Sequence, residues 1–363
     1  MSRQSVVGEA VAVAVAANLP VILWGAPGTG KTSSMLALGA SLGVPVEVVV
    51  GSIREPSDFS GLPVLREDAT WFAPPRWAER LAAAGSGLLF LDELTTAPPA
   101  VQAAMLRVVL ERTVGDLTLP SEVRIVAAAN PPEQAADGWD LSAPLANRLI
   151  HLNWEIDVAA VTEGFTSGFS TPELKHKGEP SEAEIAKAKT LVAAFLRVRP
   201  ALALVVPDGP EQAGRSWPSP RSWEMAAHAV AACVHTEVDD EVRAELVLGA
   251  VGEGAGFEFL SWLTNLDLPD PETLLADPQG AQLPDRTDRL YALLGALVSH
   301  VLADGSAEKW EQAWGVIARV ARSAPDVAAS AARALAKQRP AAATLPTTIL
   351  ELAPILRAAG LMR

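Results

Sequence analysis

Short apolar runs recur through the first part of the chain, and the first of them, at 20–24, is β-branched. Runs of this kind, without strict alternation, are typical of strands that are buried on both faces of a parallel sheet. Helical segments are expected between or before them, as at 5–17 and 31–42. This order of elements predicts an α/β core. The expected strands are 20–24, 45–50, 88–93, 123–129 and 149–154.

Two further segments of the core predict hairpins. The first has a turn at 66–69 between two short apolar stretches. The second covers 112–125, with its turn near 119–121, where a proline and a serine stand. Ordinary surface hairpins are the alternative interpretation of both. The two strands of the first hairpin are expected at 62–65 and 70–73.

The rest of the chain has the apolar spacing of helices. Segments rich in Gly, Pro, Ser and charge predict loops at 164–184 and 207–218, and 266–282 is expected to be a linker. The helices are expected at 184–203, 221–235, 239–252 and 284–303. The predicted domains are an α/β core at 1–158, a helical lid at 159–265 and a helical C-terminal extension at 266–363.

Charge and composition narrow the possible functions. Asp and Glu number 43 against 29 Lys and Arg, which gives a formal net charge of −14. Such a field disfavours general coating of DNA or RNA, although a local basic groove stays open. Cys233 is the one cysteine, so no internal disulfide can form and a reducing, cytoplasmic location is expected. No apolar stretch reaches about 18 residues, so no membrane span is expected.

A glycine-rich motif directly follows the run at 20–24. It fits G-x-x-x-x-G-K-[ST], in which glycines let several backbone N–H groups point at one phosphate and the next helix presents its positive end. Lys31 is expected to reach the β- and γ-phosphates, and the Thr32 hydroxyl to bind Mg²⁺. A chance glycine-rich turn is disfavoured by the strand before and the helix after. The predicted nucleotide-binding residues are Gly25, Ala26, Pro27, Gly28, Thr29, Gly30, Lys31, Thr32 and Ser33.

Polar residues stand next to three other strands. Asp92 is expected to hold the Mg²⁺ shell through water, and Glu93 to orient and deprotonate the attacking water. Asn130 could hydrogen-bond the γ-phosphate and that water, although a plain Asn-Pro turn is the simpler interpretation of this site alone. Arg148 precedes the strand at 149–154 and is either a surface residue or an arginine finger for a neighbouring subunit.

Together these motifs resemble those of the AAA+ ATPases. The resemblance covers about residues 5–235. Ser-Pro-Arg at 219–221 looks like the sensor 2 signature of the MoxR group, although a proline that opens a helix also has a purely structural explanation. Both predicted hairpins lie where the same clade carries its helix-2 insert and its pre-sensor-1 hairpin. The matching motifs are GAPGTGKT for Walker A, LLFLDE for Walker B, Asn130 for sensor 1 and Arg148 for the finger.

The resemblance implies Mg²⁺-dependent hydrolysis of ATP to ADP and phosphate by a homo-oligomer, in this family a hexameric ring. MoxR-like proteins are chaperone-like and remodel or mature partner proteins, often partners with a von Willebrand factor A domain. Two other functions stay open: the motor subunit of a metal chelatase, and a nucleic-acid motor. The catalytic residues that the resemblance implies are Glu93, Asn130, Arg148 and Arg221.

The sequence departs from the family pattern in two places. Some members couple ligand binding to the catalytic glutamate through a polar residue after the second strand, and here the nearest candidate is Ser52. The finger motif has Asn147 and Leu149 around Arg148, where Asp-Arg-Phe is commoner. This difference leaves Arg112 as a second candidate for the finger.

The predicted hairpins favour a protein partner over a nucleic acid. Acidic residues outnumber basic ones around the two turns, whereas phosphate backbones are bound by Lys and Arg. Apolar residues of the first hairpin could instead hold a polypeptide. These residues are Leu62, Val64, Trp71 and Phe72.

Overall fold

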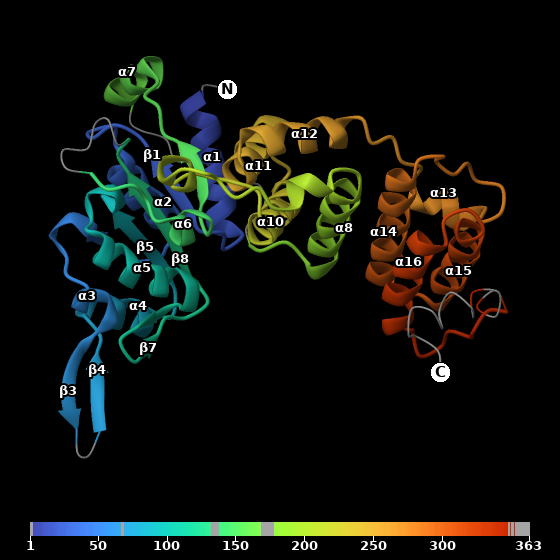
Figure 1. The fold of residues 1–363 in the computed structure, drawn as a ribbon, viewed down its shortest axis with the longest axis horizontal. Coiled ribbons are helices and arrows are strands. Elements are labelled where there is room, and N and C mark those ends of the chain that lie inside the picture. Colours follow the sequence, from blue (N-terminus) through green and yellow to red (C-terminus); the bar gives the residue numbers. More distant parts are fainter. Residues whose placement is uncertain are drawn as a thin grey trace. The chain divides into compact units, whose positions relative to one another are not determined.

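The computed structural model describes residues 3–66, 69–131, 138–167 and 178–347, together with Ile349 and Leu352 (Figure 1). The chain divides into two compact units. One unit combines Met1–Glu179 with Leu202–Phe257, and the other combines Pro180–Ala201 with Glu258–Arg363. Part of the loop predicted at 164–184 falls on residues 168–177 and so lies outside the described residues.

A five-stranded parallel sheet forms the centre of the first unit, in the order β2-β5-β8-β1-β9. Apolar residues fill its central strands, and nearly all of their side chains are buried, as expected for a sheet covered on both faces. All five predicted strands are confirmed. Their bounds are Val21–Trp24 for β1, Val46–Val50 for β2, Gly87–Asp92 for β5, Val123–Ala129 for β8 and Ile150–Asn153 for β9.

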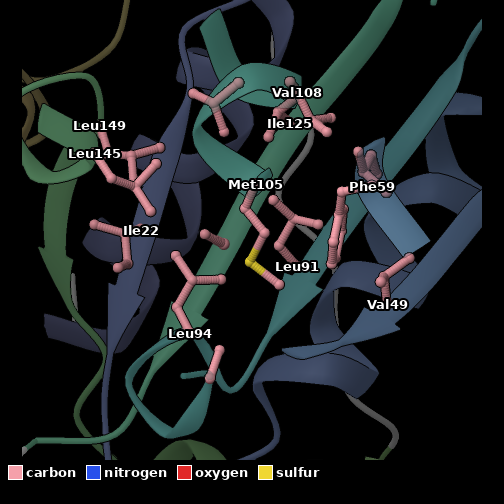
Figure 2. Close-up of a cluster of buried hydrophobic side chains, with 14 of the residues drawn as sticks. Ile22, Val49, Phe59, Leu91, Leu94, Met105, Val108, Ile125, Leu145 and Leu149 are labelled. Atoms are coloured by element: carbon pink, nitrogen blue, oxygen red, sulfur yellow. The ribbon is translucent and has the colours of Figure 1, made fainter. Parts of the chain in front are cut away.

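Helices cover the two faces of the sheet. Figure 2 shows Met105 lying over one face near Leu91 and Ile125, in a core to which α3, α4, α5 and α6 contribute. Side chains alternate along a strand, so Val21 and Leu23 point to the other face, and α1, α2 and α11 also contact the sheet. The helices are α1 (Arg3–Ala16), α2 (Lys31–Leu42), α3 (Ser57–Ser60), α4 (Arg76–Ala84), α5 (Pro99–Glu111), α6 (Ala143–Ala146) and α11 (Asp240–Val251).

The first predicted hairpin is confirmed. Strands β3 (Leu62–Arg66) and β4 (Ala69–Ala73) pair antiparallel, with Leu62 opposite Ala73. Figure 1 shows this hairpin extending away from the sheet of its unit. Residues 67–68 of its predicted turn lie outside the described residues.

The second hairpin is present, but the turn predicted near 119–121 is wrong. Strands β6 (Thr113–Val114) and β7 (Leu117–Thr118) pair around a two-residue turn. Gly115 opens this turn with a φ of 60°, which suits a hairpin turn with glycine at its first central position. Leu119 is buried instead of standing at a tip, because its side chain belongs to the core of the unit.

The remaining helices of the first unit lie before and after the predicted sensor 2 triplet. α10 (Pro220–Thr236) begins at this triplet, because Ser219 and Ser222 form a capping box and Pro220 takes the first helical position. The predicted loop at 207–218 contains the single-turn helix α9 (Pro210–Ala213). The other elements are α7 (Val158–Ser167), α12 (Glu253–Thr264), which extends into the second unit, and the 3₁₀ turns η1 (Gly51–Ile53), η2 (Leu94–Thr96) and η4 (Pro200–Ala203).

The second unit is helical in its described part. The linker predicted at 266–282 is wrong for α13 (Pro271–Ala276), which Asp270 caps and which buries two leucines. α8 packs on α14, where a Cβ added to Gly295 would lie 1.8 Å from Thr190 Cγ2. The helices are α8 (Glu182–Val198), α13, α14 (Thr287–Asp304), α15 (Ala307–Ala321) and α16 (Pro325–Lys337).

The predicted lid covers 159–265, but α8 belongs to the second unit whereas α10 and α11 belong to the first. The scheme of three domains therefore stays a prediction. Within the part of the chain that the structure describes, no helix combines the length and the apolar character needed to cross a bilayer.

Candidate functional site

The chain leaves β1 through the glycine-rich motif and enters α2 at Lys31. Gly28 and Gly30 have φ values of 78° and 84°, which L-residues with a Cβ rarely adopt. A Cβ added at either glycine would meet nothing within 4 Å, so the space beside the loop is open. No side chain caps α2, so the first N–H groups of this helix are left for an anion. The loop therefore has the form of a phosphate cradle.

Trp154, which follows β9, braces this loop through hydrogen bonds. Its backbone N–H donates to Trp24 O over 2.6 Å, and its indole Nε1 donates to Thr29 O over 3.0 Å. A Cβ on Gly25 would lie 2.5 Å from Trp154 O. The sequence motif did not indicate this brace, because Trp154 is 125 residues away from Thr29.

Lys31 lies across the glycine-rich loop. Its Nζ donates to Gly25 O over 2.7 Å and to Ala26 O over 3.0 Å, with a longer bond of 3.4 Å to Asn130 Oδ1. Burial lowers the pKa of this ammonium group, and the nearby Asp92 carboxylate opposes that shift. The ammonium group is thus held between the loop and the end of β8.

The Thr32 hydroxyl and the Asp92 carboxylate are in contact. Thr32 Oγ1 donates to Asp92 Oδ2 over 2.8 Å, and the Glu93 N–H donates to Asp92 Oδ1 over 2.9 Å. A hydroxyl and a carboxylate oxygen are hard ligands of the kind that Mg²⁺ takes together with several waters. The residues present therefore fit a Mg²⁺ ion, with Thr32 and Asp92 as the groups that would hold it.

Glu93 leaves the end of β5 in a strained backbone conformation. Its φ is 57°, in the left-handed region, where a non-glycine residue costs about 1–3 kcal/mol and is often found at functional sites. Its Oε2 accepts a hydrogen bond from Ser52 Oγ. Ser52 comes two residues after β2, which pairs with β5 in the sheet. The geometry thus joins Ser52 to the predicted catalytic carboxylate.

A short turn after Glu93 links this acid to Asn130. Thr96 Oγ1 donates to Glu93 O over 2.9 Å, and Thr95 Oγ1 donates to Asn130 O over 3.1 Å. Trp139 N donates to Thr95 O over 2.6 Å and ties the segment after β8 to the same turn. Sequence reasoning missed Thr95 and Thr96, because their partners lie in backbone carbonyls that no motif specifies.

Arg148 lies at the opposite edge of the sheet. It precedes β9, whose first residue pairs with Val21 at the start of β1, whereas the P-loop follows the end of β1. Arg148 Nη1 donates to Pro144 O, and its Nε is buried without a hydrogen-bond partner among the described residues. Burial, and then the like charge of Arg221, lower the pKa of this guanidinium group.

The start of α10 brings Arg221 near Arg148. Ser219 Oγ donates to Asn147 Oδ1 over 2.7 Å, and Asn147 Nδ2 donates to Trp217 O over 3.1 Å. Both bonds hold the beginning of α10 beside the residue that precedes Arg148. Two positively charged groups that are distant in sequence therefore share one place at the amino edge of the sheet.

Arg112, the rival finger, donates hydrogen bonds from both of its Nη atoms within its own unit. Its Nη1 donates to Pro120 O, Ser121 O and Val123 O over 3.3, 3.2 and 2.5 Å. Its Nη2 donates to Asn18 Oδ1 over 2.6 Å. These bonds join α5, the segment before β8 and the turn before β1.

Part of the chain is similar to a known protein family. Residues 20–149 match the family described as "AAA domain (dynein-related subfamily)", and curated proteins give no match. Among solved structures, one described as "a putative ATPase from Cytophaga hutchinsonii" is 17% identical, with a TM-score of 0.44, over 66% of this chain and 79% of that chain. The matched segment contains the glycine-rich loop, the two acids, Asn130 and Arg148. Residues 20–149 are therefore similar to an AAA domain, and they contain four of the five strands of the parallel sheet.

Proposed function

We propose that this protein is a Mg²⁺-dependent ATPase that hydrolyses ATP to ADP and phosphate. One observation carries the proposal: the carboxyl edge of the sheet brings together a lysine, a metal-binding pair and a carboxylate base. Lys31 contacts Asn130, Thr32 contacts Asp92, and Glu93 follows directly. This is the set of groups that phosphoryl transfer to water needs.

Each of these residues has one part in the reaction. The amides of the P-loop and Lys31 bind the β- and γ-phosphates, and Thr32 and Asp92 hold Mg²⁺. The ion, when bound, neutralises phosphate charge. Glu93 orients the attacking water and accepts its proton, and Ser52 positions the Glu93 carboxylate.

Asn130 binds the γ-phosphate and the attacking water. Its side-chain Oδ1 lies 3.4 Å from Lys31 Nζ, which supports a place beside the same phosphate. Thr95 holds the backbone of Asn130 from the turn that follows Glu93. The two strands that supply the base and the amide are thereby fixed to each other.

Arg148 and Arg221 act on the nucleotide of a neighbouring copy, so the active form is a homo-oligomer. The four residues of β9 span roughly 10 Å between Arg148 and the P-loop edge, which places this pair away from the site of its own chain. Arg148 has a partnerless Nε within the described residues, whereas Arg112 has donors bonded to four acceptors. We therefore assign the finger to Arg148, with Arg221 beside it.

The biological role that we propose is MoxR-like: a ring, hexameric in this family, that remodels or matures a partner protein in the cytoplasm. A partner with a von Willebrand factor A domain is one such protein. The β3–β4 hairpin supports a protein partner, because Leu62 and Leu65 are 60% and 82% exposed. Arg66, a cation of this hairpin, stacks on Trp71 with 3.6 Å between guanidinium carbon and ring centre.

Two substitutions test the ATPase assignment. Lys31→Ala should abolish most nucleotide affinity, because the main side-chain charge on the phosphates is lost. Glu93→Gln should keep affinity and lower turnover by about 10²–10⁴-fold, the usual contribution of a general base. Glu163→Gln, which changes an exposed carboxylate on α7, is the matched control. Near-native turnover by Glu93→Gln would refute the role of Glu93.

Mixing variants tests the action in trans. Arg148→Ala should bind ATP normally and hydrolyse it poorly. Addition of excess Lys31→Ala protein should restore part of the turnover, because intact fingers then meet intact P-loops. A loss of ATP affinity in isolated Arg148→Ala monomers would contradict this assignment.

Nucleic acid serves as the test of the competing motor function. DNA affinity depends mainly on neutralisation of phosphates by Lys and Arg, and this chain has a formal net charge of −14. Single- and double-stranded DNA should therefore leave the ATPase rate unchanged at near-physiological salt. Several-fold stimulation by either DNA would instead favour a nucleic-acid motor.

A further inference from the structure

The β3–β4 hairpin lacks support along its length. Its two strands form a sheet of their own within the described residues, and all five residues of β3 are exposed. An isolated two-stranded hairpin is at best marginally stable in water. Its orientation therefore depends on whatever holds its base.

The turn of the β6–β7 hairpin holds that base through three hydrogen bonds. Phe72 N donates to Asp116 Oδ2 over 2.7 Å, and Asp116 N donates back to Phe72 O over 3.0 Å. Gly115 N donates to Phe59 O over 3.1 Å, on the segment that leads into β3. One turn thus grips both the entry to the long hairpin and its returning strand.

Two glycines bring the backbones into direct contact at this point. A Cβ on Gly115 would lie 2.4 Å from Phe72 O, and a Cβ on Gly61 would lie 2.8 Å from Gly115 Cα. Both glycines also have positive φ values, which favour glycine. Because the contact is made by backbone on both sides, the two hairpins can only move together while it persists.

The short hairpin is fixed, at its other end, to the segments that carry the catalytic groups. It follows α5, the helix after Glu93 and η2, and it precedes β8, which Asn130 directly follows. Arg112 stands between α5 and β6 and donates to Val123 O at the start of β8. Leu119 N donates to Arg112 O over 2.7 Å and closes the base of the short hairpin.

We propose that Asp116 is a positioning residue that couples the nucleotide state of the site to the β3–β4 hairpin. This inference rests on the proposed ATPase function. A displacement of Glu93 or Asn130 moves α5 or β8, to which the short hairpin is attached. The hydrogen bonds between Asp116 and Phe72, here called the Asp116 bracket, then pass this displacement to the β3–β4 hairpin. The coupling needs the acceptor of Asp116 and not its charge, because the partner is a backbone N–H.

A spin label at Leu65→Cys reports directly on the hairpin. Leu65 is 82% exposed, so a label there leaves packing intact. Cys233 is the one native cysteine, and burial raises the pKa of its thiol to about 12, so it will not compete for the label. Spectra are recorded with no nucleotide, with Mg-ADP, and with Mg-ATP on a Glu93→Gln background.

Three labelled proteins are compared: one with the native Asp116, one with Asp116→Ala and one with Asp116→Asn. With Asp116, the label should change mobility between ATP and ADP. Asp116→Ala should abolish this change and raise mobility in every state, while the turnover of the chain with native Glu93 stays within about twofold, because Asp116 is an exposed surface residue. Asp116→Asn keeps a side-chain acceptor and should restore the response.

The outcomes separate the coupling from the ATPase function. If Asp116→Ala keeps the nucleotide-dependent change, the Asp116 side chain is not the coupling element, since this variant keeps the backbone bonds and lacks only the side-chain acceptor. If the unmodified bracket gives no change although a fluorescent ATP analogue binds and ATP is hydrolysed, the hairpin is not coupled to the site. If the analogue does not bind, the proposed ATPase function fails. If the label in Asp116→Ala has unchanged mobility without nucleotide, the Asp116 side chain does not position the hairpin.

Discussion

Arg112→Ala is expected to damage stability and to spare the trans reaction. The guanidinium group of Arg112 is partly buried, and burial together with the like charge of Arg124 lowers its pKa. It donates hydrogen bonds to three backbone carbonyls and to Asn18 Oδ1. Truncation to alanine removes all four bonds and leaves these acceptors without that donor.

The magnitude follows from the two short bonds. The contacts with Val123 O and Asn18 Oδ1 measure 2.5 and 2.6 Å, and a hydrogen bond from a charged donor contributes about 1.5–3 kcal/mol. The cost of burying the guanidinium group offsets part of this sum, so the free energy of unfolding should fall by about 2–4 kcal/mol. In the first unit, which has about 235 residues, this corresponds to a decrease in Tm of about 4–16 °C.

Thermal and urea unfolding of Arg112→Ala, Arg112→Lys and Arg148→Ala measure the difference. Lysine cannot reproduce the forked donors of Arg112, so Arg112→Lys should recover only part of the stability. Arg148→Ala should change the free energy of unfolding by less than about 1 kcal/mol, because Arg148 makes one backbone bond and faces the like charge of Arg221. The reasoning fails if Arg112→Ala unfolds like the native chain but loses ATP hydrolysis that Lys31→Ala protein restores.

Two other predictions concern the support of the P-loop. Gly25→Ala should weaken ATP affinity, measured by calorimetric titration, by at least about tenfold, because the new Cβ would lie 2.5 Å from Trp154 O. Gly254→Ala is the control and should leave ATP affinity unchanged, because a Cβ there would meet nothing within 4 Å. His151 accepts from Trp24 Nε1, and burial lowers its pKa to about 4, so protonation favours the unfolded chain. Urea unfolding should show stability falling by up to about 3 kcal/mol from pH 6.5 to 4, and His151→Gln should remove this pH dependence.

The strands and the P-loop could be predicted because their signals are local. β8 has the predicted bounds, since an uninterrupted apolar run fixes a buried strand without information from elsewhere in the chain. The groups at the ends of the strands follow from the same pattern, because parallel strands present their carboxyl ends at one edge. Ser52 beside Glu93 is the clearest case, because the two residues follow the carboxyl ends of the neighbouring strands β2 and β5.

The turn of the second hairpin could not be predicted in the same way. Both Gly115-Asp116 and Pro120-Ser121 are turn signals, and the sequence offers no means to rank them. The contact of Gly115 with Phe59 and Phe72, and the burial of Leu119, decide the choice. These are tertiary effects between segments more than 40 residues apart, as the separation of 44 between Phe72 and Asp116 illustrates.

The role of Arg112 depended on contacts that are even more distant. Asn18, its partner, is 94 residues away. Its φ of 57° is a left-handed conformation that could not be predicted from the sequence. The two arginines therefore look alike as sequence candidates and differ only in their surroundings. Arg112 donates from both Nη atoms to four acceptors of its own unit, whereas Arg148 has a buried Nε without a partner among the described residues.

Charge at the two edges of the sheet gives the physical reason to expect head-to-tail assembly. Arg148 and Arg221 are close enough to lower the pKa of Arg148, and neither forms an ion pair with any carboxylate that the structure describes. Such a pair is stabilised when an anion lies between its members. The carboxyl edge, where the P-loop would hold a triphosphate, offers that anion on a second copy. Contact between unlike edges is heterologous, and it closes into a ring when the rotation between copies permits. Arg221→Ala should therefore weaken nucleotide-dependent assembly, measured by sedimentation with ATP on a Glu93→Gln background. Unchanged assembly of that variant would remove Arg221 from the interface and leave Arg148 as the one trans residue.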